Sequence, residues 1–239
     1  MGLKIVAISD LHGYLPEIIE SADIMLIAGD ISPLNIQFNK PEIKKWLETE
    51  FAYWIKSLPV DKVYLIAGNH DAYFEGINSL NIAALKEQCD FKLIYLENNY
   101  IIHRHDGEEF RIFGTPYCHI FGSWPFMRED LYMEKKFLAI PEECDIIISH
   151  DPPYNIGKVD QILESTRWNR GTPESVGNPP LAKQLAKTKF KLLVCGHIHS
   201  GDHNIFEFNG GKVVNVSIKN ENYQPIYEPF YITITKWHI

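Results

Sequence analysis

Five short clusters of Asp, Asn and His side chains stand directly after apolar runs of strand length. In an open α/β sheet the carboxyl ends of the strands share one edge, so we expect the five clusters to converge in space. The clusters are Ser9-Asp10-Leu11-His12-Gly13, Ala28-Gly29-Asp30, Ala67-Gly68-Asn69-His70-Asp71, Ile148-Ser149-His150-Asp151 and Cys195-Gly196-His197-Ile198-His199.

The converging set offers carboxylate oxygen, amide oxygen and imidazole nitrogen, without a thiolate. Such mixed donors suit Mn²⁺, Fe, Zn²⁺ or Ni²⁺ better than Ca²⁺ or a structural zinc site. The set exceeds what one metal ion needs, whereas two ions that share one carboxylate fit its size. The candidate metal ligands are Asp10, His12, Asp30, Asn69, His150, His197 and His199.

Taken singly, most of these clusters have a simpler interpretation. An isolated Asp-x-His is more often a surface turn than a ligand pair, and Gly-Asp after a strand is equally unspecific. Gly-Asn-His-Asp could be a turn in which Gly and Asn supply positive φ. The His-x-His pair is more specific, because both imidazoles point the same way beyond a strand. All five clusters in this order favour a shared site.

The elements that must position these residues alternate between strands and helices, which predicts an α/β fold with a largely parallel central sheet. Strands are predicted at 5–8, 24–28, 63–67, 146–148 and 192–195, and helices at 16–22, 41–58, 79–88 and 180–187. Short antiparallel strands are predicted at 203–208, 212–216 and 230–235, with a hairpin turn at Asn209-Gly210-Gly211.

No linker, low-complexity tract or internal repeat divides the chain, so residues 1–239 are expected to form one domain. Two long irregular segments, 115–128 and 151–179, remain between the predicted elements. Loops of that length are usually functional, so substrate choice is expected to lie there.

The composition excludes several classes of protein. With 45% hydrophobic and 23% charged residues, the chain is an ordinary globular protein and not a disordered one. A net charge of -8 argues against an extended nucleic-acid surface. No apolar run approaches the ~18 residues of a membrane span, and the first apolar run suits a buried strand better than a signal peptide. We therefore expect a cytoplasmic protein whose four cysteines are reduced and buried.

The series D-x-H, G-D, G-N-H-D, S-H and G-H-x-H resembles that of the calcineurin-like metallophosphoesterases over almost the whole chain. The stretches Ser149-His150-Asp-Pro-Pro, Gly196-His-Ile-His-Ser-Gly201 and Val214-Asn-Val-Ser217 are most similar to the MPPED (metallophosphoesterase domain-containing, or brain 239-like) branch. This resemblance implies a four-layer α/β/β/α sandwich of two mixed sheets flanked by helices.

Carried over position by position, the resemblance implies two metal sites that share one carboxylate. Asp10, His12, Asp30 and His199 would hold one ion, and Asp30, Asn69, His150 and His197 the other. The ions are expected to be divalent, with Mn first and Fe, Zn, Ni or Mg as alternatives. His70 is implied to be catalytic: it faces the substrate phosphate and either protonates the leaving oxygen or stabilises transition-state charge.

Two departures from the family pattern concern the surroundings of these histidines. Phosphoprotein phosphatases carry G-D-x-x-D-R, but the stretch that starts at Gly29 lacks the second Asp and the Arg. This argues against a Ser/Thr protein phosphatase and leaves the partner of His70 open, with Asp71 as a candidate or else as a solvated turn carboxylate. Asp151 stands where the MPPED branch has Gly, and it either changes the charge at the entrance or, as we favour, bonds its own loop.

Substrate contacts are predicted from Asn69 and from an aromatic and basic group in the second irregular segment. Arg167 or Arg170 could bind a phosphate oxygen while Trp168 stacks on a base, with Tyr154 nearby. Ordinary loop packing is the alternative. The other histidines are interpreted as surface or core residues: His103, His105, His119, His203 and His238.

The expected activity is hydrolysis of small phosphodiesters, cyclic nucleotides among them, by in-line attack of a hydroxide that bridges the two ions. The preference for diesters follows from the MPPED resemblance alone. A nuclease or phosphomonoesterase of the same superfamily is an alternative, as is a non-catalytic scaffold, against which the intact ligand set argues. The expected partner is a small phosphoester, and the sequence leaves the oligomeric state open.

Overall fold

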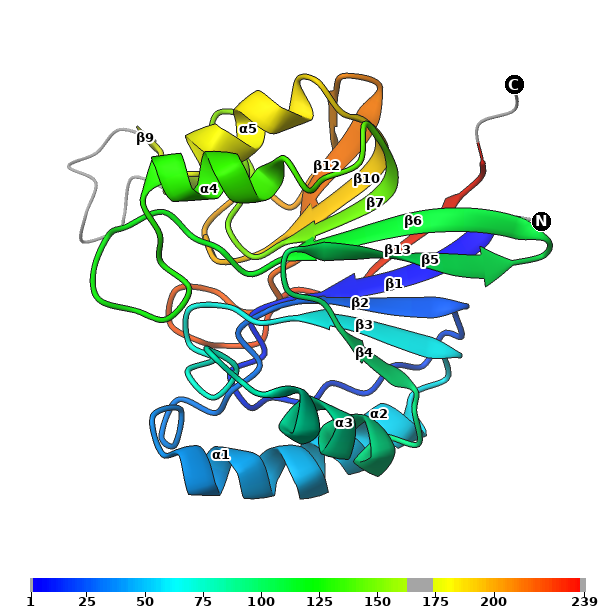
Figure 1. The fold of residues 1–239 in the computed structure, drawn as a ribbon, viewed down its shortest axis with the longest axis vertical. Helices are drawn as coiled ribbons and strands as arrows, with labels where there is room; N and C mark the ends of the chain where they lie inside the picture. Colours follow the sequence, from blue (N-terminus) through cyan, green and yellow to red (C-terminus); the bar gives the residue numbers. More distant parts are fainter. Residues whose placement is uncertain (1, 163–173, 237–239) are drawn as a thin grey trace.

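Two β-sheets pack face to face at the centre of the molecule (Figure 1). The structure, a computed structural model, describes residues 2–162 and 174–236. The first sheet has the order β13-β1-β2-β3-β4, with strands β1 (Leu3–Ile8), β2 (Ile24–Ala28), β3 (Lys62–Ile66), β4 (Leu93–Tyr95) and β13 (Phe230–Ile234). Its strands β1 to β4 are parallel, and β13 is antiparallel to β1.

The second sheet has the order β11-β12-β10-β7-β6-β5. Its strands are β5 (Asn99–His105), β6 (Glu108–Thr115), β7 (Glu143–Ser149), β10 (Lys189–Cys195), β11 (Phe206–Phe208) and β12 (Gly211–Asn215). The four inner strands are parallel, and β5 and β11 add antiparallel edges. A separate two-stranded ribbon pairs β8 (Gln161–Ile162) with β9 (Glu174–Ser175).

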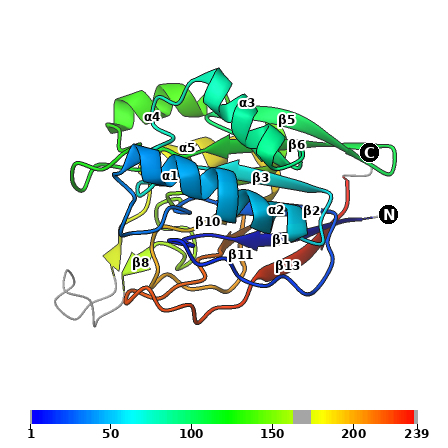
Figure 2. The same ribbon diagram turned by 90° about the horizontal axis from the view of Figure 1, so that it is seen from below.

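Helices cover the outer face of each sheet. The helices α1 (Lys40–Trp46), α2 (Ala52–Ser57) and α3 (Ser79–Gln88) lie on the first sheet, and a π-helical turn, η1 (Leu47–Phe51), joins α1 to α2 (Figure 2). The helices α4 (Asp130–Phe137) and α5 (Pro179–Leu185) lie on the second sheet (Figure 1). The predicted four-layer α/β/β/α sandwich of two mixed sheets is therefore confirmed.

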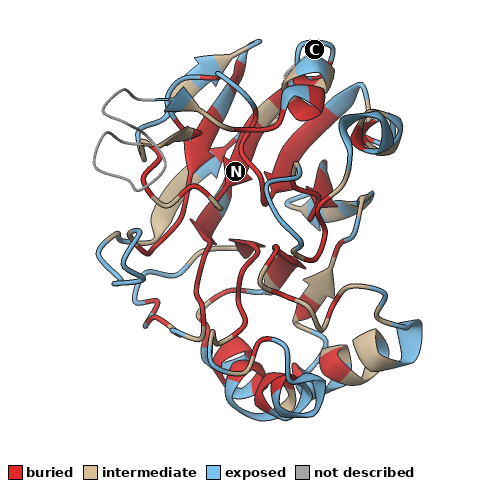
Figure 3. Ribbon diagram, turned by 90° about the vertical axis from the view of Figure 1, so that its left-hand side faces the viewer, coloured by how far each residue is buried: buried red, intermediate tan, exposed pale blue. Residues whose placement is uncertain are grey.

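The inner strands are largely buried (Figure 3). Successive residues in them belong to two different hydrophobic clusters, one on each face of the sheet. In β1, Ile5 and Ala7 belong to the apolar layer between the sheets, whereas Val6 and Ile8 belong to the layer under the helices. This double burial explains why these strands read as continuous apolar runs.

Most of the predicted elements are found, with boundaries shifted by a few residues. The segment 16–22 is an exception, because it forms no helix. Its main chain is bound by a tertiary contact instead: Trp54 Nε1 donates to the Pro16 carbonyl at 2.8 Å, while Ile18 is buried in the core. The last third is also not a purely antiparallel unit, since β12 pairs parallel to β10.

The hairpin of β5 and β6, strand β4 and helix α4 were not expected from the sequence. No residue of β5 is fully buried, and the strand has no continuous apolar run. Helix α4 buries only Met133 and Phe137, so its apolar pattern is weak. All four cysteines are buried and none forms a disulfide. Among the described helices, none has both the length and the apolar character needed to cross a membrane.

The layer between the sheets should contribute strongly to stability. Ile146 in β7 is fully buried there, so Ile146→Ala is expected to lower the free energy of unfolding by about 2–5 kcal/mol. Urea unfolding followed by circular dichroism measures this change. The control Ile226→Ala, at a side chain that is 56% exposed, should stay within about 0.5 kcal/mol of wild type. A loss below about 1 kcal/mol for Ile146→Ala would contradict this assignment of the core.

Candidate metal centre

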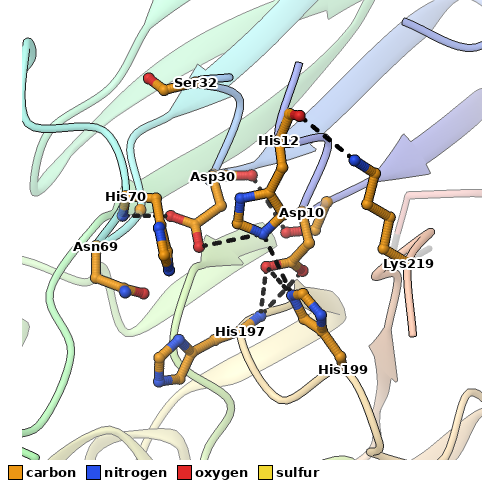
Figure 4. Close-up of polar contacts among 12 residues, drawn as sticks. Asp10, His12, Asp30, Ser32, Asn69, His70, His197, His199 and Lys219 are labelled. Atoms are coloured by element: carbon orange, nitrogen blue, oxygen red, sulfur yellow. Dashed lines mark hydrogen bonds and ion pairs between the residues drawn. The ribbon is translucent and has the colours of Figure 1, made fainter. Parts of the chain in front are cut away.

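The five clusters meet beyond the carboxyl ends of strands from both sheets. Figure 4 labels residues of the first, second, third and fifth clusters. Clusters one to three follow β1, β2 and β3 of the first sheet, and the other two follow β7 and β10 of the second. Main-chain bonds hold the loops together: Asp10 N–H donates to Gly29 O at 3.0 Å, and Gly196 N–H donates to His150 O at 3.0 Å. The structure thus brings all the candidate ligands to one place, while their role as ligands stays a prediction.

The backbone at this place is strained. Four candidate ligands lie in the left-handed region, with φ of 58° at Asp10, 41° at His12, 54° at Asp30 and 67° at His197. Such conformations cost of order 1–3 kcal/mol each and cluster at functional sites. Gly29 also has positive φ, and a Cβ at this position would lie 2.6 Å from Nδ1 of His150, which explains the glycine before Asp30.

Asp10, His12 and His199 form the first group of donor atoms, all within 4.8 Å of one another. The two Nε2 atoms of His12 and His199 are 3.4 Å apart, and Asp10 Oδ1 is 3.3 Å from His199 Nε2. His199 Nδ1 donates to the Asn220 carbonyl at 3.0 Å, which directs Nε2 toward the group.

Asp30, Asn69 and His150 form a second group. His150 Nε2 lies 3.0 Å from Asn69 Oδ1 and 3.4 Å from Asp30 Oδ2. Its other ring nitrogen, Nδ1, donates to the Ala28 carbonyl at 2.7 Å. Asp30 Oδ2 is also 3.8 Å from His12 Nε2, so this carboxylate stands between the two groups.

A thiol lies beside the second group, which the predicted donor set without sulfur did not include. Donor atoms of Cys118, His150 and His197 lie within 4.8 Å of one another. Cys118 is fully buried, and burial raises the pKa of its thiol well above the usual range. Because Cys118 sits in the irregular segment before α4 and outside any motif, no sequence pattern pointed to it.

Burial and charge determine the protonation of the donor atoms. Burial lowers the pKa of His12 to about 3 and that of His197 to about 4, so both rings offer lone pairs at neutral pH. Burial also opposes the charged form of His150, but Asp30 outweighs it and raises this pKa to about 10. Lys219 is buried nearby, with Nζ 3.4 Å from the His12 carbonyl, and burial lowers its pKa (Figure 4).

This donor set fits divalent cations. With Nδ1 of His150 and His199 each committed to a main-chain carbonyl, their Nε2 atoms face carboxylate and amide oxygens. Nitrogen and oxygen atoms that can bind a metal therefore converge on common points, and a cation there would replace the proton that Asp30 holds on His150. A cation satisfies such an arrangement, and imidazole with carboxylate suits Mn, Fe, Zn or Ni.

His70 lies beside this cluster and is held from several sides. Its main-chain N–H donates to Asp30 Oδ1 at 2.7 Å, and its ring Nδ1 donates to Gln37 Oε1 at 2.6 Å. The ring packs edge-on to His12, with centroids 4.8 Å apart, and against Trp124 at 4.5 Å. Gln37, from the loop before α1, is thus the partner that the sequence left open.

Asp71 is not that partner, and both expectations for it were wrong. The side chain is fully buried and so is not a solvated turn carboxylate. It accepts bonds from the Ser32 hydroxyl at 2.6 Å, the Ser32 N–H at 2.9 Å and the Gly68 N–H at 2.9 Å. Asp71 therefore ties the loop after β2 to the loop after β3, which carry Asp30 and Asn69.

A cleft of about 660 Å³ opens over the cluster. Asp30, Asn69, His70, His197 and His199 line its polar part, and its walls include the aromatic rings of Phe121, Trp124 and Tyr223. Among the described residues that line it there is no Lys or Arg, and Glu221 adds a carboxylate. The predicted substrate contacts Arg167, Trp168 and Arg170 lie outside the described residues, and Tyr154 does not line the cleft.

His119 differs from its interpretation as a surface or core residue, because it lines the cleft. Its ring Nδ1 is 2.8 Å from Asp151 Oδ2, and burial, which lowers the pKa of His119, is outweighed by this carboxylate, which raises it. Asp151 is fully buried, so it neither charges the entrance nor bonds only its own loop.

The other described histidines do not line the cleft. His103 bonds the Tyr64 hydroxyl at 2.8 Å, His105 lies 3.6 Å from Asp23, and His203 stacks on Tyr227. His238 lies outside the described residues.

Comparison with known proteins identifies the family to which the chain is similar. The family model described as calcineurin-like phosphoesterase matches residues 3–201. Metallophosphoesterase domain-containing protein 1 of Homo sapiens is 28% identical over 256 residues, covering 97% of this chain and 71% of the human protein. The resemblance stated from the sequence motifs is thereby confirmed.

Two solved structures share the fold. The protein TT1561 of Thermus thermophilus aligns with a TM-score of 0.58 and 13% identity, covering 90% of this chain and 89% of that one. The phosphopantetheinyl hydrolase of Mycobacterium tuberculosis aligns with a TM-score of 0.57 and 14% identity, covering 97% and 95%. At these identities the likeness concerns the fold alone.

Metal binding should stabilise the chain measurably. Saturating Mn²⁺ at 100 times its dissociation constant is expected to add about 2.7 kcal/mol per ion to the free energy of unfolding. Thermal unfolding and elemental analysis of metal per chain measure this effect, and a chelator should reverse it. Asp30→Asn keeps the volume but loses the shared charge and should lose most of the shift, whereas the distant His105→Asn should keep it. An equal shift in Asp30→Asn, or none with Mn, Fe, Zn, Ni or Mg, would contradict the site.

Proposed function

Because the chain belongs to the calcineurin-like phosphoesterase family, we propose that it is a metal-dependent phosphoesterase that hydrolyses small phosphodiesters. The observation that carries this proposal is the position of Asp30 between two groups of donor atoms, with His70 on the same carboxylate. A carboxylate shared by two donor groups would hold two ions close enough together to act on one phosphoryl group.

The proposed metal ligands are those predicted from the sequence. Asp10, His12 and His199 would hold one ion, His150, Asn69 and His197 the other, and Asp30 both. When bound, two divalent cations, with Mn as the first candidate, supply positive charge that polarises the phosphoryl group and makes hydrolysis at neutral pH feasible.

His70 is proposed as the residue that acts on the leaving group. Because its Nδ1 donates to Gln37 and its ring is packed between His12 and Trp124, only Nε2 remains to meet a substrate. In the ring protonated on both nitrogens, Nε2–H would donate to the leaving oxygen and transfer its proton to it while Nδ1–H stays on Gln37, a contribution typically of ~10²–10⁴-fold.

The cleft favours a diester over a monoester. A phosphomonoester approaches two negative charges at neutral pH, whereas a diester carries one and has a second organic substituent. The described lining contains Glu221 but no Lys or Arg, so only the proposed cations would balance the charge of the phosphate, and a diester has less charge to balance. Its aromatic walls of Phe121, Trp124 and Tyr223 suit an aromatic substituent, so cyclic nucleotides are among the candidate substrates.

The proposed activity can be tested with two chromogenic esters. With Mn²⁺, the chain is expected to hydrolyse bis-p-nitrophenyl phosphate with higher kcat/KM than p-nitrophenyl phosphate, because the cleft suits one charge and two substituents. His70→Ala should lower kcat by ~10²–10⁴-fold without loss of metal. Turnover no higher than that of Asp30→Asn with any of the candidate metals would reject the enzyme, and a preference for the monoester would reject the diesterase.

Gln37 is expected to affect catalysis only through its hydrogen bond to the His70 ring. Gln37→Ala is expected to lower kcat by ~10–100-fold while KM and metal content stay unchanged, because the His70 ring loses the acceptor that orients it. Gln37→Glu keeps an acceptor oxygen and should retain more activity than the alanine variant. Asn35→Ala, at an exposed position in the same loop, is the control. Equal losses in Asn35→Ala and Gln37→Ala would refute the assigned contact.

A further inference from the structure

A second histidine outside the metal-ligand motifs is built into the cleft. Both the main-chain N–H and the ring Nδ1 of His119 meet the same oxygen, Asp151 Oδ2, at 2.9 Å and 2.8 Å. Residue 119 is therefore held at two points by one carboxylate, which determines both the path of its loop and the orientation of its ring.

The carboxylate that holds His119 is itself anchored. Asp151 is fully buried, and its Oδ2 also accepts from Asn178 Nδ2 at 3.1 Å. Asn178 in turn caps α5, because its Oδ1 accepts the Leu181 N–H at 3.0 Å. The imidazole is thus connected through Asp151 and Asn178 to the start of a helix on the second sheet.

With Nδ1 committed to Asp151, Nε2 is the ring atom that remains for a ligand. The His119 side chain keeps 23% of its surface exposed, and it lines the cleft. Among the described residues no protein group bonds its Nε2. Its position also differs from that of His70: His119 lies beside His197 and Phe121, whereas His70 lies beside His12 and Trp124.

A phosphate in this cleft needs hydrogen-bond donors. The described lining contributes the carboxylates Asp30 and Glu221 but no Lys or Arg, so side-chain donors must come from the amide, the imidazoles, the Trp124 indole and the Tyr223 hydroxyl. Of these, Asn69 faces His150, and His70 is placed for the leaving group. His119 is the lining imidazole to which the proposed reaction assigns no part.

We propose that His119, positioned by Asp151, is a substrate-binding residue whose Nε2–H donates to an oxygen of the phosphate group while its Nδ1–H donates to Asp151. This inference rests on the proposed phosphoesterase function and adds a contact to it. Two imidazoles from different loops, His70 and His119, then meet the phosphoester at different ends of the donor cluster.

Binding of inorganic phosphate to the Mn²⁺-loaded protein tests the contact without turnover. Calorimetry should show affinity about 10- to 100-fold weaker in His119→Ala than in wild type, as expected for a hydrogen bond to a charged group. The KM for bis-p-nitrophenyl phosphate should rise with it, and kcat should change less. His119→Gln places an amide donor near the position of Nε2 and should recover much of the affinity, and His105→Gln, at the opposite edge of the sheets, is the matched control.

The alanine variant should remain folded, because Asp151 keeps the main-chain N–H of residue 119 and Asn178 as donors. Metal content and the thermal midpoint verify this. Unchanged phosphate affinity and KM in His119→Ala would overturn the inference while leaving the phosphoesterase intact. Loss of metal in that variant would also overturn it, since His119 would then act on the metal site. A wild-type protein that neither binds phosphate nor hydrolyses esters would reject the proposed function itself.

Discussion

The carboxylate of Asp30 is the interaction on which the rest of the site depends. It is 1% exposed, one oxygen accepts the His70 N–H, and the other lies between His12 and His150. A buried carboxylate is strongly unfavourable unless its charge is paired. The surrounding imidazoles, and any cation bound among them, therefore stabilise Asp30 in its buried position. Through these contacts Asp30 also positions the loops after β1, β2, β3 and β7.

Sequence reasoning located the residues whose place follows from strand geometry. Asp10 follows β1 of the first sheet and His150 follows β7 of the second, so the strand ends within each sheet and the packing of the two sheets together bring them close. Gln37, Cys118 and His119 could not be found this way, because each reaches the site through a loop whose path depends on tertiary contacts. The same reason explains the segment 16–22, whose main chain is held by Trp54 and not by helical bonds. The prediction of Asp71 as the partner of His70 was wrong because successive side chains in a tight turn point in different directions.

The partner of His70 is an amide, so it leaves the net charge of the site unchanged, which a carboxylate in its place would not. An amide oxygen accepts the His70 Nδ1–H and orients the ring, but it adds no negative charge. The site already buries Asp10 and Asp30, with Glu221 on the cleft wall. A third carboxylate on His70 would increase the repulsion of an anionic substrate. The absence of the G-D-x-x-D-R aspartate is thus compatible with an ordered histidine.

Because the donor residues come from both sheets, we expect the cluster to form late in folding. Its members come from residues 10 to 199, and they meet only when the layer between the sheets has closed. Neither half of the chain carries a complete donor group for two ions, so a partly synthesised or nicked chain would have low affinity for metal. Tight metal binding would therefore mark molecules in which both sheets have docked, and the affinity would report on the integrity of the whole fold as well as on the site.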